Sequence, residues 1–182
     1  DLLEDYADYV TIGTIGDMVP LLNENRAIVK AGLKLINTDA KIGISALKKS
    51  TNSKAEHFSA TDVAFQICPR INAAGRMDTA NLAVDLLTCE DNEIAEYKAE
   101  QLNLENTHRH EVEEKIDKDI AEIMANDRAY QTDRVIVVAG HNYHKGVIGI
   151  CAAHLVELYS KPAIVIGIDD EGNATGSARS ID

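Results

Sequence analysis

Two arginines flank a short run of small residues and could hold an anion. Residues 69–77 read PRINAAGRM, which places Arg70 and Arg76 around an Ala-Ala-Gly pivot just before a predicted helix. An arginine guanidinium stays charged and can grip a phosphate through two parallel hydrogen bonds, and Gly75 lets the backbone come close to a ligand. The segment therefore indicates a phosphate or other anion as ligand. The alternative is an ordinary helix start with a surface arginine.

Two later segments have the same chemistry. Residues 144–146 form a loop that leads into a predicted helix, whose free amide groups favour an anion. The loop consists of His144, Lys145 and Gly146. Hydroxyls and a guanidinium of the same type come from Ser177, Arg179 and Ser180. On these residues alone, a solvated turn is the preferred interpretation of each segment.

Asp17 is the residue that could bind a metal ion. It follows Gly16 at the end of a predicted strand over residues 9–15, where a carboxylate can reach a hard divalent cation. One carboxylate does not hold a catalytic pair of metals, and a lone aspartate here is more often a helix cap. His57 and His154 are expected to be structural or exposed.

In the middle of the chain, the elements predicted to position these groups are helices. Pro69 is predicted to end a helical turn that begins near Ser59, because the residue before a proline is pushed out of helical geometry. A long helix is predicted up to about Asn126, with an apolar stripe in steps of three or four that Asn106 and Arg109 interrupt. Such a helix would span on the order of 50 Å and could connect two lobes. The two polar residues mark either the gap between the lobes or a face toward a bound strand.

The last third of the sequence has the pattern of an α/β sheet. Strands are predicted over residues 135–139 and 163–168, with a helix over residues 147–159 between them. This order favours a parallel pair with a right-handed crossover. A third strand is predicted over residues 174–179, and the chain stops soon after it. The open sheet edge leads us to expect a truncated domain.

Composition narrows the class of protein. The chain has 182 residues, 45% of them hydrophobic, which is enough for a real core. No apolar run approaches the length of a membrane helix and no leader is apparent, so a soluble, cytoplasmic protein is expected, with its three cysteines reduced. The net charge of −12 argues against nucleic acid at first sight. However, residues 90–126 hold twelve acidic against four basic residues, so a DNA surface would be local. It would be made of Arg70, Arg76, Lys145 and Arg179.

Four motifs in order resemble one family. Residues 13–21 read GTIGDMVPL, and they are followed by RINAAGR at 70–76, HKGVIGI at 144–150 and GSARS at 176–180. Together they resemble the RecJ form of the DHH/DHHA1 phosphoesterases, the 5′-to-3′ exonucleases specific for single-stranded DNA. The resemblance implies an internal fragment: residues 1–78 from the C-terminal part of the DHH catalytic domain, 79–130 connecting helices, and 131–182 the start of a DHHA1 domain.

The same resemblance assigns roles to residues. It implies that Asp17 is the last ligand of a Mn²⁺ or Mg²⁺ site whose other ligands lie in motifs absent here, so that the fragment alone is inactive. It implies a DNA-backbone contact for the motif residues named above and for Asn72, and a parent enzyme in DNA repair and recombination. Arg109 is a further candidate for such a contact, because of its place in the stripe of the long helix. Its implied partners are single-stranded DNA, a single-stranded-DNA-binding protein and a helicase, with no membrane.

Two other functions remain open at this point. The parent could be a small-nucleotide phosphodiesterase of the same superfamily, although a small ligand does not require lobes set far apart. The chain could instead be a non-catalytic acidic scaffold whose helix over residues 90–126 docks a basic protein, although a charge run is usually a solvated face.

Overall fold

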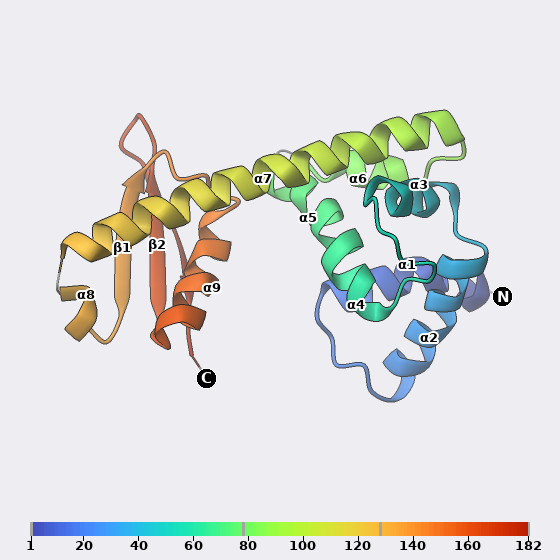
Figure 1. Cartoon of the computed structure of the whole chain (residues 1–182), viewed down its shortest axis with the longest axis horizontal. Coiled ribbons are helices and arrows are strands. Elements are labelled where there is room, and N and C mark those ends of the chain that lie inside the picture. Colours follow the sequence, from blue (N-terminus) through green and yellow to red (C-terminus); the bar gives the residue numbers. More distant parts are fainter. Residues whose placement is uncertain (1, 78, 128, 182) are drawn as a thin grey trace. The chain divides into compact units, whose positions relative to one another are not determined.

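The protein is described by a computed structural model, which covers residues 2–77, 79–127 and 129–181 (Figure 1). The chain divides into two compact units, Asp1–Asn106 and Thr107–Asp182. The described residues of the first unit are helical, whereas the second unit contains a three-stranded sheet. The chain is therefore α/β, as predicted, but the parallel sheet expected in its first part does not occur in the described residues there.

The first unit packs its helices around one apolar core. The helices are α1 (Leu2–Gly16), α2 (Asn23–Thr38), α3 (Ile42–Ser50), α4 (Ala60–Asp62), the π-helical η1 (Val63–Ile67), α5 (Cys68–Met77), α6 (Asn81–Leu87) and the first part of α7 (Asn92–Asn126). Fully buried side chains join them, among them Ile36, Leu47, Ile67, Leu86 and Leu102. This core fixes the positions of α1 and α5, which carry the first candidate site.

The strand predicted over residues 9–15 is wrong, because this stretch belongs to α1. Its buried positions recur in steps of about four, at Ala7, Asp8, Thr11, Ile12 and Ile15, which is the spacing of one helix face. This face packs closely on α2. A Cβ added at Gly32 would lie 2.1 Å from the Ala7 carbonyl oxygen, so only glycine allows the two helices to approach this far. The alternation of apolar residues over residues 9–15 is too short to distinguish a strand from a helix, and the residues buried against α2 follow the helical period.

Pro69 does not end the helical turn before it, contrary to the sequence prediction. In a regular α-helix its ring would clash with the carbonyl four residues earlier. The π-helical turn η1 directly precedes it, and the Cys68 amide donates to the Val63 carbonyl five residues back. The chain then continues as α5 through Met77. The Ala-Ala-Gly segment is therefore part of a helix and not a pivot before one.

The second unit is a small sheet with helices. Its strands β1 (Ile136–His141), β2 (Ala163–Ile168) and β3 (Ala174–Arg179) lie in the order β1-β2-β3. The first pair is parallel, as predicted, and β2 pairs with β3 in antiparallel fashion. Every second residue of β1 is buried, and α9 (Ile148–Tyr159) packs on β2 and β3. The short helix α8 (Ala129–Thr132) precedes β1.

The long helix α7 is confirmed, with 35 residues from Asn92 to Asn126. The boundary between the units falls within it, between Asn106 and Thr107, where its apolar stripe is interrupted. Ala95, Ala99 and Leu102 are buried in the first unit, and Ile116 and Ile120 in the second. None of the described helices is both long and apolar enough to cross a membrane.

Candidate metal and phosphate-binding sites

The first unit has a cavity where two predicted motifs meet. Its volume is about 750 Å³, and it lies between the end of α1 and the start of α5. It is lined by Ile12, Gly13, Gly16, Asp17, Cys68, Ile71, Asn72 and Arg76. The candidate metal ligand Asp17 therefore shares one cavity with two of the predicted phosphate-binding residues. More than fifty residues of sequence separate them.

The local geometry explains why these side chains meet. α1 ends at Gly16, Met18 takes a left-handed backbone conformation, and the exposed Asp17 follows directly on the last turn. A Cβ at Gly16 would lie 3.2 Å from the Cys68 Sγ, so α1 ends in close contact with the start of α5. Asn72 and Arg76 are four residues apart on α5 and therefore lie on one face of it.

Cys68 is part of the wall of this cavity and is not a reactive group. Its thiol donates to the Ile12 carbonyl at 3.6 Å, and burial raises the pKa of the thiol to about 11. The thiolate is the reactive form of cysteine, so Cys68 is inert near neutral pH. The three cysteines are free, as predicted.

Arg70 lies outside the cavity lining and is held by its neighbours. Its Nε donates to the Asn103 Oδ1 at 3.0 Å, and its Nη1 donates to the Gln66 carbonyl at 2.6 Å. Burial lowers the pKa of Arg70 from its ordinary value. These bonds connect α5 to α7 within the first unit, so Arg70 has a structural role whatever else it binds.

The second unit brings two of the predicted segments together. Gly149 is in the first turn of α9, and a Cβ there would lie 3.0 Å from the Ser177 Oγ and 3.1 Å from the Arg179 Nη2. The Arg179 Nη1 also donates to the Ser177 Oγ at 3.2 Å. The start of α9 therefore faces a hydroxyl and a guanidinium on β3.

The loop before α9 is ordered by its histidine. The His144 carbonyl accepts from the amides of Val147 and Ile148, and its Nδ1 accepts from the Gly146 amide at 3.2 Å. Lys145 is exposed at the tip of this turn. Ser180 follows β3 and donates to the Ile181 carbonyl, without a described contact to this group.

Arg109 is in a different environment from the other predicted residues. It is 9% exposed, its Nη1 lies 3.5 Å from the Glu113 Oε2, and its Nη2 lies 2.6 Å from the His110 Nε2. These partners are on its own helix. A DNA contact for Arg109 stays a prediction.

Solved structures share this fold. The Thermus thermophilus RecJ in complex with Mg²⁺ aligns with a TM-score of 0.83 at 34% identity, covering 98% of this chain and 27% of that one. An exonuclease RecJ bound to manganese aligns with a TM-score of 0.82 at 32% identity, covering 99% of this chain and 43% of that one. The fold is therefore that of a segment of metal-bound exonuclease structures.

Curated relatives identify the family. The single-stranded-DNA-specific exonuclease RecJ of Bacillus subtilis is 39% identical over 182 residues, covering all of this chain and 23% of the relative. That of Haemophilus influenzae is 35% identical over 181 residues, covering 98% of this chain and 32% of the relative. No protein-family model matches the chain. The chain belongs to the RecJ family, and it spans about a quarter to a third of the length of these relatives.

Proposed function

We propose that this chain is the part of a metal-dependent 5′-to-3′ single-stranded-DNA exonuclease that supplies one metal ligand and several contacts to the DNA backbone. The observation that carries the proposal is the cavity shared by Asp17, Asn72 and Arg76. It combines a hard oxygen donor for a cation with an amide and a guanidinium for a phosphate. The printed names of the relatives, which specify single-stranded DNA, support this substrate.

Asp17 fits the role of one ligand to Mg²⁺ or Mn²⁺. It is exposed, it directly follows the end of α1, and its carboxylate oxygens suit both ions. When bound, such ions activate water and neutralise the phosphate under attack. Among the described residues that line the cavity, Asp17 is the one carboxylate, and the resemblance places the other ligands in motifs outside this sequence, so the fragment by itself is expected not to hydrolyse DNA.

The chain's own residues would bind and orient the strand. Arg76 would pair with phosphate oxygens, and Asn72, one turn away on the same face, would donate its amide to the same group. In the second unit, Lys145 and Arg179 would neutralise further phosphates, while Ser177 and the free amides at the start of α9 donate hydrogen bonds. Gly146 would let the backbone come close to a phosphate, and His144 orders the loop.

The remaining parts of the proposal come from the family resemblance. They are a cytoplasmic parent enzyme in DNA repair and recombination, with a single-stranded-DNA-binding protein and a helicase as partners. The small-nucleotide phosphodiesterase is not favoured, because the relatives named above are DNA exonucleases.

Fluorescence anisotropy with a 5′-phosphorylated single strand tests the proposal on the 182-residue chain. We expect salt-sensitive binding that weakens about tenfold in Arg76→Ala, since a charge-assisted hydrogen bond contributes about 1.5–3 kcal/mol and this site is open to solvent. Arg134→Ala is the matched control, because Arg134 is exposed and lines neither candidate site. Equal loss in both variants, or equal binding of double-stranded DNA, would show the proposal to be wrong.

A further inference from the structure

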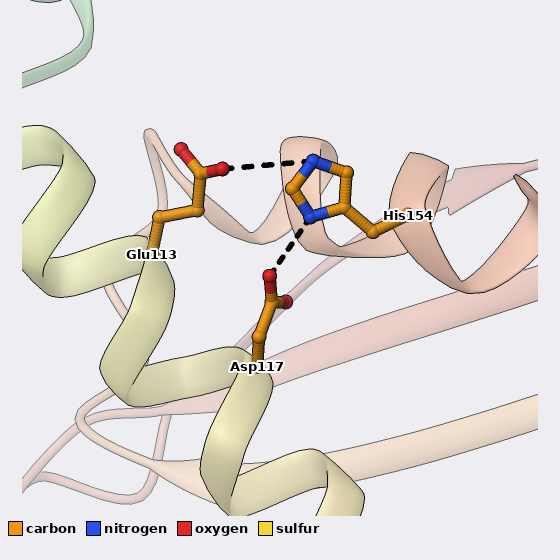
Figure 2. A group of neighbouring side chains, drawn as sticks. All are labelled: Glu113, Asp117 and His154. Carbon is orange, nitrogen blue, oxygen red and sulfur yellow. Dashed lines mark hydrogen bonds and ion pairs between the residues drawn. The ribbon is translucent and has the colours of Figure 1, made fainter. Parts of the chain in front are cut away.

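A histidine of α9 lies between two carboxylates of α7 (Figure 2). The His154 Nδ1 is 2.8 Å from the Asp117 Oδ2, and its Nε2 is 3.5 Å from the Glu113 Oε1. One potential ligand atom from each of the three side chains lies within 4.8 Å of the others. All three residues belong to the second unit, so their arrangement is independent of Asp17 and its cavity.

The spacing of these residues suits a shared ion. Glu113 and Asp117 are four residues apart on α7 and present both carboxylates on one helix face. His154 approaches from α9, as Figure 2 shows. Two carboxylates and one imidazole are a ligand set that Zn²⁺ accepts, with a water molecule in the fourth position of the tetrahedron.

The Glu113 carboxylate has a buried partner behind it, as metal ligands usually do. The Arg109 Nη1 lies 3.5 Å from the Glu113 Oε2, and Arg109 is itself buried. Cys151, on the same helix as His154, is fully buried and does not belong to the clustered ligand groups.

The two oxygens of Glu113 have different surroundings. Its Oε2 lies 3.5 Å from the Arg109 Nη1 and 3.9 Å from the His110 Nδ1, so its Oε1, which faces His154, is the oxygen that could bind an ion. A cavity of about 260 Å³ is lined by Asp117 and His154, so a small ion has a route from solvent to the cluster.

We propose that Glu113, Asp117 and His154 bind one divalent transition-metal ion of the Zn²⁺ type, which joins α7 to α9. The imidazole ligand selects against Mg²⁺, which prefers oxygen ligands and water. The two imidazole nitrogens of His154 face different carboxylates, so one carboxylate must swing toward the nitrogen that binds the ion. The guanidinium of Arg109 stays next to the Glu113 Oε2, where it compensates the negative charge on that oxygen.

The competing interpretation is a bridge without metal, in which a doubly protonated His154 pairs with both carboxylates. It predicts no saturable metal binding at this cluster. Titration calorimetry of the metal-free 182-residue chain with ZnCl₂ separates the two. We expect one Zn²⁺ per chain, and at least a tenfold loss of affinity in His154→Ala and in Glu113→Gln, since even residues that only orient ligands contribute 10–100-fold.

Matched controls isolate the site. Glu114→Gln removes the exposed neighbouring carboxylate, and His57→Gln removes an exposed histidine of the first unit. Both variants should bind Zn²⁺ like the unaltered chain, and a tenfold excess of Mg²⁺ should not displace it. No saturable binding, or unchanged affinity in both cluster variants, would overturn the site.

X-ray absorption at the zinc edge of the unaltered chain keeps the proposal testable if a variant does not fold. The assigned ligands predict a shell of nitrogen and oxygen at about 2.0–2.2 Å. A sulfur neighbour at about 2.3 Å would mean that a cysteine binds the ion, and would overturn the three-ligand assignment.

Discussion

Asn72 and Arg76 lie four residues apart on α5, and both line the cavity that holds Asp17. This relationship explains the spacing within the RINAAGR motif, because a helix places Asn72 and Arg76 on the same side. In an extended loop the two side chains would not share a side in this way. The candidate phosphate contact therefore depends on the helical conformation of α5, and so on the π-helical turn that admits Pro69.

Arg76→Lys should separate charge from geometry at this site. Lysine keeps the positive charge but loses the planar fork that binds two oxygens at once. We expect weaker binding of single-stranded DNA at every salt concentration with an unchanged salt dependence. In Arg76→Ala the slope of log affinity against log salt should fall by about 0.7, the value for one phosphate of a single strand. Anisotropy titrations from 50 to about 200 mM salt measure both. A lysine variant whose slope falls as much as that of alanine would contradict this.

The sequence predicted the second unit better than the first, for a physical reason. The strands at 163–168 and 174–179 are bounded by turn residues, and the bounds of β2 and β3 match them. In contrast, the apolar run at residues 9–15 is too short for its period to distinguish strand from helix. The close packing of this run against α2 at Gly32 favours the helical conformation.

The sequence likewise predicted one of the two candidate sites and missed the other. Motif residues such as Asp17 and Arg76 were named from the sequence, but their common cavity depends on how α1 meets α5. The cluster around His154 was missed, and this residue was expected to be structural or exposed. The signal was the i, i+4 pair of carboxylates at Glu113 and Asp117, but the same helix holds a second such pair at Glu96 and Glu100. The pairing of α7 with α9 singles out this one.

Gly32→Ala should destabilise the first unit strongly. The added Cβ would lie 2.1 Å from both the Ala7 carbonyl oxygen and the Thr11 Oγ1, so α1 and α2 must move apart. We expect a loss of at least about 2 kcal/mol in the free energy of unfolding, in the range for overpacked cores. Urea unfolding followed by circular dichroism measures it.

Gly13→Ala is the control for this substitution. Gly13 lies in α1 with nothing within 4 Å of an added Cβ. Alanine is the better helix former, so Gly13→Ala should leave stability unchanged or raise it by up to about 1 kcal/mol. Similar losses in the two variants would mean that close packing against Ala7 is not the cause.

Arg70→Ala should reduce stability, because the hydrogen bonds to Asn103 and to the Gln66 carbonyl are lost. We expect a loss of about 1–3 kcal/mol in the free energy of unfolding. Lys30→Ala, an exposed cation on α2, should change stability little. In a double-mutant cycle, Arg70 and Asn103 should show coupling of about 0.5 kcal/mol or more, whereas additive effects would exclude a direct contribution from their bond.

Gly149→Ala should impair the phosphate contacts of the second unit more than its folding. The added Cβ would lie 3.0 Å from the Ser177 Oγ and 3.1 Å from the Arg179 Nη2, and both are ends of side chains that can move aside. We expect several-fold weaker binding of single-stranded DNA with a melting temperature close to that of the unaltered chain. Full binding by this variant would show that Ser177 and Arg179 need not keep their present positions.

The burial of Cys68 should make stability depend on alkaline pH. Burial raises the pKa of its thiol from 9.0 to about 11 in the folded chain, so the unfolded chain loses this proton first as pH rises. The contribution of the neutral thiol is therefore fully present below about pH 9 and is lost progressively toward pH 11. We expect the stability difference between the unaltered chain and Cys68→Ala to shrink over this range in urea unfolding at pH 8, 9, 10 and 10.5. A difference for Cys68 that stays constant across the range would mean that its thiol ionises equally in the folded and unfolded chains.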